Sequence, residues 1–138
     1  MTQDEFNAYC ATLPHTSHVV QWGGADVWKV GSPAKNKVFV VGGWQKNEQS
    51  GTAVSEINYA ASFKCGEIGF EMLRDTPGCR PAPYLASRGM KWIQCFDNTS
   101  LSDADLFDYI KDSHRRASLN LTKKLQRELG LNQGGGDA

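Results

Sequence analysis

The sequence predicts an α+β domain: a two-layer structure in which helices pack on one face of an antiparallel β-sheet. The expected elements follow the order helix, several strands, helix, two strands and helix, with short turn-rich connections. The 138 residues, of which 40% are hydrophobic, suit a single core, and we find no internal repeat. We therefore expect one domain over residues 1–131 and a flexible, glycine-rich tail over residues 132–138.

The first helix is expected over residues 2–12, where apolar side chains recur at helical spacing. Thr2 is a suitable N-cap, and Asp4 and Glu5 favour the positive end of the helix dipole. Pro14 then ends the helix, because proline cannot continue its hydrogen-bond pattern.

Three strands are expected next. A short strand around Val19 and Val20 is joined by a turn at residues 23–26 to a second strand at residues 27–30, so these two form a hairpin. Residues 37–42 are rich in β-branched and aromatic side chains, as is typical of a central strand.

A polar, turn-rich loop is expected over residues 44–52, before a fourth strand at residues 56–64. This strand is predicted by strict alternation of apolar and polar side chains. Its apolar face consists of Ile57, Tyr59, Ala61 and Phe63.

The period then changes, and residues 65–75 predict a short amphipathic helix packed on the sheet. Its apolar face is expected to consist of Ile68, Met72 and Leu73. Pro77 and Gly78 stop this helix, and residues 80–96 predict a second hairpin.

The last part of the domain is helical. Ser102 followed by Asp105 predicts a capping box at the start of a helix. The apolar periodicity continues as far as Leu129, so this helix is either long or broken near residues 118–120. Gly130 is a suitable C-cap.

Residues 74–95 form the stretch best suited to present a binding surface. Prolines 77, 81 and 83 exclude a helix there and favour a turn leading into an edge strand. Basic and aromatic side chains alternate along the stretch, and such a mixture suits an anion or a stacked ring. The residues concerned are Arg80, Tyr84, Arg88, Lys91 and Trp92.

Several function classes are disfavoured. The four cysteines form no CxxC pair, and the three histidines are scattered and expected at surface or capping positions, so we expect no metal, no cofactor and no catalytic residue. The net charge is zero, which disfavours a strongly basic nucleic-acid binder. No segment resembles a secretory signal or a membrane span, so a cytoplasmic monomer without membrane contact is expected.

Several fragments, in order and spacing, resemble the bacterial MmcQ/YjbR family over about residues 4–125. They are Leu13-Pro14 with Thr16, Trp22-Gly23 before residues 26–30, Lys37-Val38-Phe39, Phe63-Lys64-Cys65, Leu73-Arg74, residues 77–85, Lys91-Trp92-Ile93, and Ile110 with Asp112-Ser113. The resemblance implies a CyaY-like fold and a double-wing DNA-binding motif, in a family whose molecular function is largely uncharacterised.

Under this resemblance, we expect a non-enzymatic protein that binds duplex DNA with two β-hairpin wings. Lysine and arginine would neutralise phosphates while aromatic rings pack on sugar or base. The first wing would use Lys29, Lys35 and Lys37, and the second Arg80, Tyr84, Arg88, Lys91 and Trp92. Lys64 would lie beside a helix N-terminus that attracts anions.

Three alternatives stay open. The basic residues can be solvated, edge-protecting charges, with Tyr84 and Trp92 partly in the core. A small aromatic ligand can bind against Trp22, Trp28, Tyr84 or Trp92, which requires a pocket. Finally, an exposed strand edge can serve a protein-interaction adaptor.

Overall fold

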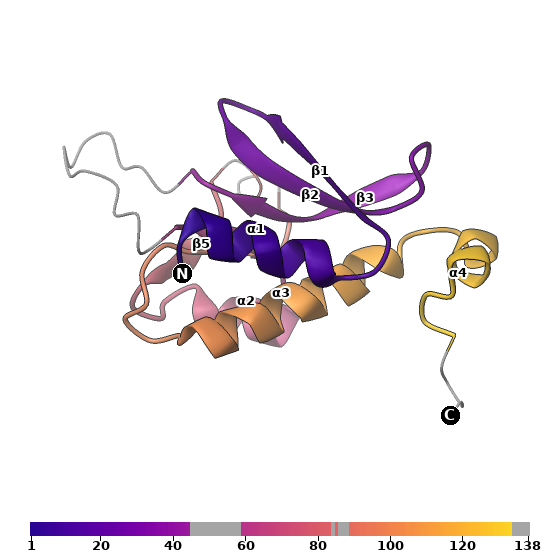
Figure 1. Ribbon diagram of the computed structural model, residues 1–138. Coiled ribbons are helices and arrows are strands. Elements are labelled where there is room, and N and C mark those ends of the chain that lie inside the picture. Colours follow the sequence, from indigo (N-terminus) through magenta and orange to yellow (C-terminus); the bar gives the residue numbers. More distant parts are fainter. Residues whose placement is uncertain (45–58, 84, 86–88, 134–138) are drawn as a thin grey trace.

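The computed structural model describes residues 1–44, 59–83, 85 and 89–133 (Figure 1). Its elements are α1 (Gln3–Thr12), β1 (Thr16–Gln21), β2 (Ala25–Gly31), β3 (Asn36–Gly42), β4 (Ala61–Lys64), α2 (Glu67–Leu73), β5 (Cys79–Pro81), β6 (Trp92–Cys95), α3 (Asp103–Ser118) and α4 (Lys123–Leu129). In the described part, six strands pair antiparallel in the order β1-β2-β3-β4-β6-β5. The predicted α+β class is confirmed.

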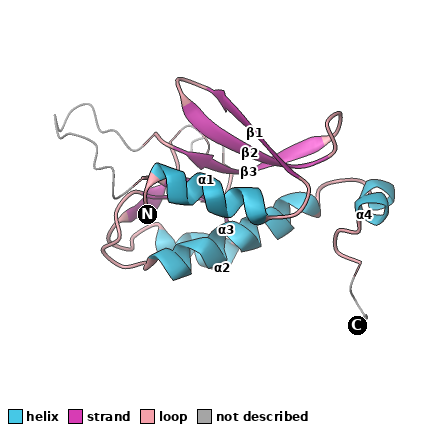
Figure 2. Cartoon of the chain, in the orientation of Figure 1, coloured by secondary structure: helices cyan, strands magenta, loops and turns pink. Residues whose placement is uncertain are grey.

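Helices α1, α2 and α3 lie together on one face of this sheet (Figures 1 and 2). Phe6, Phe39, Phe63, Ile93 and Ile110 are fully buried between the two layers. Aromatic pairs join neighbouring elements: Tyr9 of α1 stacks on Phe107 of α3 at 4.4 Å, and Phe63 of β4 stacks on Tyr109 at 5.2 Å. The helix layer and one face of the sheet therefore share a single core.

Local signals define the ends of the long helices. Ser102 and Asp105 form the predicted capping box at the start of α3. Thr2 is the N-cap of α1 as predicted, and it also forms a capping box with Glu5. The C-terminal helical region is broken, since α3 ends at Ser118 and α4 begins at Lys123. Gly130 caps α4 in the left-handed conformation with φ 72°.

A β-bulge controls which side chains of β2 and β3 face the helices. Trp28 pairs with Val40 whereas Lys29 pairs with Val38, so Phe39 has no partner on β2. Phe39 and Val40 both join the core beneath the helices. As a result, Lys29 and Val38 face the opposite side of the sheet, on which no described helix packs; we call it the second face.

The predicted apolar face of the 65–75 helix is correct for Leu73 and wrong for Ile68 and Met72. In α2, Phe70 and Leu73 are buried, whereas Ile68 is 85% exposed and Met72 is 58% exposed. Ile68 and Met72 are four residues apart and share one side, and Phe70 and Leu73 lie on the opposite side. The helix has only two turns, so its packing, rather than the count of apolar residues, selects the buried pair.

Other boundaries differ from the expectation. The predicted 56–64 strand begins at Ala61 in the described part of the chain, and residues 56–58 and most of the 44–52 loop lie outside it. The second hairpin is confirmed as β5 and β6.

His114 is buried, at 6% exposure, and its Nε2 lies 2.8 Å from the Pro14 carbonyl oxygen. No helix among the described residues has the length and apolar character to cross a membrane.

Candidate functional site

Charge is divided between the two layers, although the whole chain is neutral. The helix layer is acidic: α1 carries two carboxylates, α2 two and α3 four, against three basic residues, all on α3. The six strands carry Lys29, Lys37, Lys64 and Arg80, and their one acidic residue is Asp26. The sheet is therefore the basic layer.

Lys29, Lys37 and Lys64 lie at one end of the sheet, and we call them the lysine cluster. Lys29 and Lys64 belong to the second face, whereas Lys37 pairs with the core residue Val30 and lies at the end of β3. Lys37 and Lys64 line the same cleft, and Lys29 pairs with Val38, which also lines it. Lys37 is exposed, and the other two are partly exposed. The middle of the second face is buried, so this end is its accessible part.

The cleft opens where β3 and β4 separate. Their pairing ends at Val40 and Phe63, and continuing the register would place Phe39 opposite Lys64. Instead, the hydroxyl of Ser113 from α3 accepts a hydrogen bond from the Lys64 amide at 2.8 Å and donates one to the Phe39 carbonyl at 2.6 Å. This hydroxyl satisfies both backbone groups while holding the strands apart.

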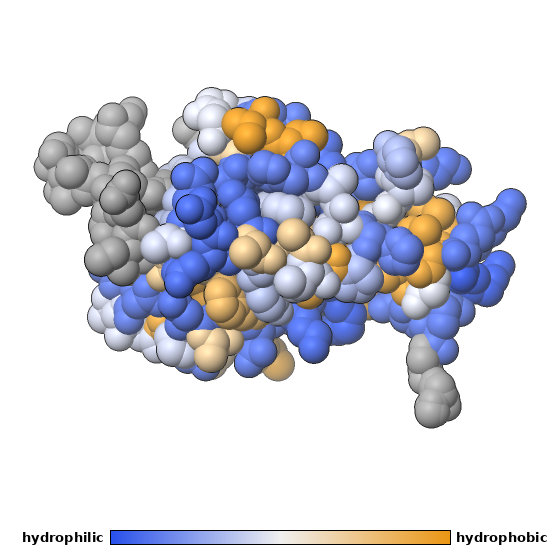
Figure 3. All heavy atoms as spheres, viewed as in Figure 1, coloured by the Kyte–Doolittle hydropathy of each residue, from blue (hydrophilic) through white to orange (hydrophobic). Residues whose placement is uncertain are grey.

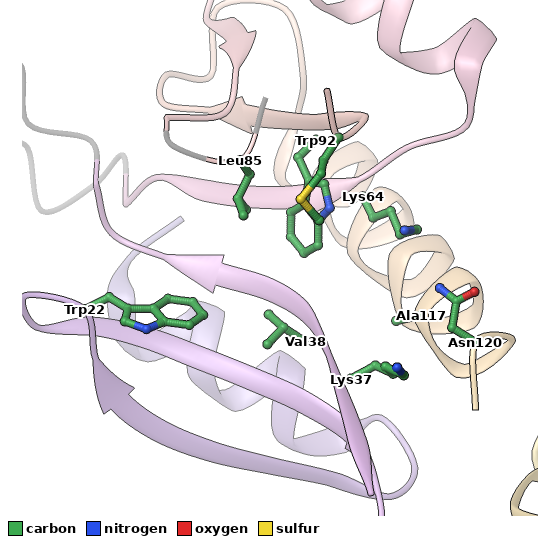
Figure 4. Close-up of a pocket in the computed structure, with 9 residues that line it drawn as sticks. Trp22, Lys37, Val38, Lys64, Leu85, Trp92, Ala117 and Asn120 are labelled. Carbon is green, nitrogen blue, oxygen red and sulfur yellow. The ribbon is translucent and has the colours of Figure 1, made fainter. Parts of the chain in front are cut away.

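The cleft has a volume of about 280 Å³ and contains both apolar and polar side chains (Figure 4). None of its lining residues is acidic. The lining consists of Trp22, Lys37, Val38, Lys64, Leu85, Met90, Trp92, Ala117 and Asn120. Figure 4 shows Lys37, Lys64, Ala117 and Asn120 on one side and Trp22, Leu85 and Trp92 toward the other.

Trp92 lines the cleft but belongs largely to the interior. It is 3% exposed, which agrees with the alternative that places this ring in the core. Its indole nitrogen is buried and has no hydrogen-bond partner. Because a buried N–H without an acceptor is costly, this donor is the most unusual polar group of the site.

Trp22 lies at the tip of the β1–β2 hairpin and is half exposed. It has a positive φ of 54° and is followed by Gly23 and Gly24, which also have positive φ, so the turn itself sets its position. Its ring stacks on Trp44 at 5.9 Å. The hairpin thus contributes an aromatic side chain to the cleft.

The other predicted site residues lie elsewhere. Arg80 donates to Gln94 at 2.7 Å and to the Trp44 carbonyl at 3.4 Å, and its guanidinium lies over Phe96. The Lys91 ammonium lies over the ring of Phe70 in α2, on the helix side. The structure does not bring these two together with the lysine cluster. Tyr84 and Arg88 lie outside the described residues.

Trp28 is also separate from the cleft. It is 7% exposed, stacks on His18 and donates its indole N–H to Asn7 at 2.9 Å. It therefore belongs to the contact between α1 and the first hairpin.

Sequence reasoning missed a polar network around Asp26, which is 3% exposed. Its carboxylate accepts hydrogen bonds from Gln3 at 2.8 Å and Tyr59 at 2.5 Å, and lies 2.8 Å from His18 Nε2. Burial alone would raise the pKa of Asp26, but these hydrogen bonds outweigh it and lower the pKa. The network joins α1, the first hairpin and the segment before β4.

All four cysteines are buried and unpaired. Burial raises the pKa of Cys10, and raises that of Cys65 to about 12. Cys79 and Cys95 are directly opposite on β5 and β6. The Cys79 thiol donates to Cys95, which raises the pKa of Cys79. The same hydrogen bond lowers the pKa of Cys95. The thiols of Cys10, Cys65 and Cys79, whose pKa values are raised, are protonated near neutral pH and are poor nucleophiles.

Within the part of the chain that the structure describes, no group of three or more His, Cys, Asp or Glu side chains is arranged to hold a metal ion. The polar side chains that line the cleft are its two lysines, the Asn120 amide, which both donates and accepts, and the indole N–H of Trp92; none of them carries a negative charge.

Comparison with known proteins gives one family and one fold. Residues 11–116 match the family model described as YjbR. The crystal structure of the Deinococcus radiodurans protein DR2400, with domain DUF419, is similar with a TM-score of 0.76 and 21% identity, over 98% of this chain and 94% of that one. At this identity the likeness shows the fold alone. No curated protein matches the chain.

Proposed function

The chain belongs to the YjbR family, as its fragments predicted, and we propose that it is a non-enzymatic protein that binds nucleic acid, duplex DNA included. The surface concerned is the lysine cluster, with the β1–β2 hairpin beside it as one wing. The single observation that carries the proposal is the division of charge between the sheet and the helices that cover it. The strands carry four basic residues against Asp26, whereas α1, α2 and α3 carry two, two and four carboxylates against three basic residues; the short helix α4, outside this layer, is basic.

Neutral net charge is compatible with this function, because phosphates respond to the local field. At physiological ionic strength, charges further than about 8 Å away are largely screened. A phosphate beside Lys37 and Lys64 meets two cations and no carboxylate among the lining residues of the cleft. The acidic helix layer lies behind the sheet and orients the protein with its basic face toward the nucleic acid.

A binding function without catalysis is supported by the state of the potential nucleophiles. The buried thiols of Cys10, Cys65 and Cys79 have raised pKa values, and the buried Cys95 accepts a hydrogen bond from Cys79. His18 and His114 are held by Asp26 and by the Pro14 carbonyl. In this arrangement, the described residues offer cations and aromatic surface rather than an activated nucleophile.

The test is fluorescence anisotropy of a short labelled DNA duplex, titrated with protein across a salt series. Affinity that falls steeply with salt supports the proposal, because it reports phosphate neutralisation. Absent or salt-independent binding at micromolar protein contradicts it.

The alternative of a protein-interaction adaptor stays a prediction, and the edge strand β1 is the surface that supports it. Val19 and Val20 are 39% and 62% exposed there, and Figure 3 shows hydrophobic atoms gathered over this hairpin. Size-exclusion chromatography and copurification of a partner would test it.

A further inference from the structure

We propose that the cleft between β3 and β4 binds one unstacked nucleotide of a single strand, with its base against Trp22 and Met90 and its phosphate between Lys37 and Lys64. This inference rests on the proposed function for the polymer. It deepens that function by naming the unit recognised and the site that takes it.

The cleft is part of the fold rather than an accident of side-chain placement. Ser113 replaces a direct hydrogen bond between Phe39 and Lys64 with a bridge through its hydroxyl, and the strands diverge beyond this point. The volume of about 280 Å³ is near the lower end of small-molecule sites, which run from about 300 to 1,000 Å³. A space of this size suits one nucleotide unit rather than an extended ligand.

The chemistry of the cleft matches the two parts of a nucleotide. Trp22, Met90 and Val38 offer a ring, a polarisable thioether and an aliphatic wall to a planar base. Lys37, Lys64 and Asn120 offer two cations and an amide to a phosphate (Figure 4). None of the lining residues carries a carboxylate, so no negative charge in the lining repels the phosphate.

Trp92 supplies an independent observation that points to a ligand. Its indole N–H is buried without a partner and belongs to a residue that lines the cleft. Base edges carry carbonyl oxygens and ring nitrogens that accept hydrogen bonds. An acceptor has to displace neighbouring side chains to reach this N–H, and Met90, which lines the same cleft and is 39% exposed, is a flexible side chain that can shift.

The geometry favours an unpaired nucleotide over a duplex. In a duplex, both faces of a base are stacked and its pairing edge is occupied, so the base cannot enter a cavity between strands. In a single strand the base is free to leave the stack at small cost. Lys29, beside Val38 at the mouth, is placed for the adjoining phosphate.

The experiment compares binding of a short single-stranded oligonucleotide, its duplex, deoxyadenosine 5′-monophosphate and the uncharged nucleoside deoxyadenosine. Anisotropy is used for the labelled polymers and tryptophan fluorescence for the two monomers. Two exposed platform side chains are removed in Trp22→Ala and Met90→Ala. Met72→Ala, which removes an exposed methionine on α2, is the matched control. Trp92→Phe keeps an aromatic ring and removes the indole donor.

We expect tighter binding of the single strand than of the duplex. The double variant Trp22→Ala, Met90→Ala should lower single-strand affinity on the order of tenfold or more, because base stacking on side chains is lost. Duplex affinity should fall less than single-strand affinity in this variant, since Trp22 also lies at the tip of the hairpin wing, and Met72→Ala should alter neither. Trp92→Phe should weaken the single strand alone. The monophosphate should bind more tightly than the uncharged nucleoside.

Each failure has a separate meaning. If the duplex binds with a steep salt dependence and the cleft variants leave single-strand affinity unchanged, the cleft proposal is overturned and the proposed function stands. If the monophosphate binds and neither polymer does, the proposed function is overturned. Equal binding of nucleoside and monophosphate would contradict the role of Lys37 and Lys64.

Discussion

The backbone amide of Lys64 donates to the hydroxyl of Ser113 at 2.8 Å, at the point where β4 parts from β3. The same hydroxyl donates to the Phe39 carbonyl, so one α3 side chain takes the place of one rung of the sheet. Lys64 then lies at the accessible end of the second face rather than inside a continuous ladder. The binding surface is in this way coupled to the packing of α3.

Ser113→Ala tests that coupling. The substitution leaves the Lys64 amide and the Phe39 carbonyl without their bridge, so unfolding free energy should fall by about 1–3 kcal/mol. Urea unfolding followed by tryptophan fluorescence measures the loss. Ser113→Thr keeps a hydroxyl and should recover most of it. Unchanged stability of the alanine variant would show that the bridge has no energetic role.

The Asp26 network predicts a specific dependence on pH. Because the folded-state pKa of Asp26 lies below its unfolded value, the carboxylate stabilises the fold above about pH 4. This contribution is lost as pH falls through the folded pKa. Asp26→Asn should therefore flatten the acid side of the stability curve, measured by urea unfolding from neutral to acid pH. Identical curves for both proteins would contradict the network.

Tyr59→Phe separates one hydrogen bond from the rest of that network. Its hydroxyl donates to Asp26 at 2.5 Å in a partly buried setting. Loss of a hydrogen bond to a charged acceptor should cost about 1.5–3 kcal/mol at neutral pH. Tyr9→Phe is the matched control, since no hydrogen bond from the Tyr9 hydroxyl enters this network, and equal losses in the two variants would argue against the assignment.

The Cys79 and Cys95 pair should form a disulfide when the protein is treated with diamide. The two residues are opposite each other at a non-hydrogen-bonded position of the ladder, since Gly78–Phe96 and Ala82–Trp92 are the bonded pairs. Such positions place Cα atoms about 4.5 Å apart, within disulfide range. The loop closed is near 15 residues, for which stabilisation is about 3 kcal/mol.

Mass spectrometry should detect the loss of two hydrogens from this pair, and unfolding should shift to higher urea. Cys79→Ser removes both effects, whereas Cys10→Ser leaves them intact. Four free thiols after prolonged oxidation would refute the pairing.

The features of the fold that could be predicted are those determined by residues close together in the sequence. The N-cap at Thr2 and the capping box of Ser102 with Asp105 act over three residues, and both form as predicted. The face of α2 was not predictable in this way, because Phe70 rather than Ile68 is selected by contacts with the sheet and Lys91. Two turns of helix give too little periodicity to decide between the two sides.

The candidate site likewise has a part that residue type predicts and a part that depends on contacts between residues far apart in the sequence. The sequence predicted Lys29, Lys37, Lys64 and Trp92 as site residues from their residue types. Lys37, Lys64 and Trp92 line one cleft, and Lys29 pairs with Val38, which also lines it. The cleft itself depends on Ser113, which acts on Phe39 from 74 residues away, and no local pattern signals such a contact. The Asp26 network is equally non-local, since Tyr59 lies 33 residues from its acceptor.

One measurement tests the central claim most directly: the salt dependence of duplex binding for two double variants that lose the same charge. Lys29→Ala with Lys64→Ala removes two cations from the lysine cluster, and Arg74→Ala with Lys111→Ala removes two from the helix side, one at the C-cap of α2 and one on α3. We expect the first pair to reduce the slope of log affinity against log salt by about 1.8, and the second to leave it unchanged. Equal slopes for the two variants, or no binding by the parent protein, would contradict the assignment of this face to nucleic acid.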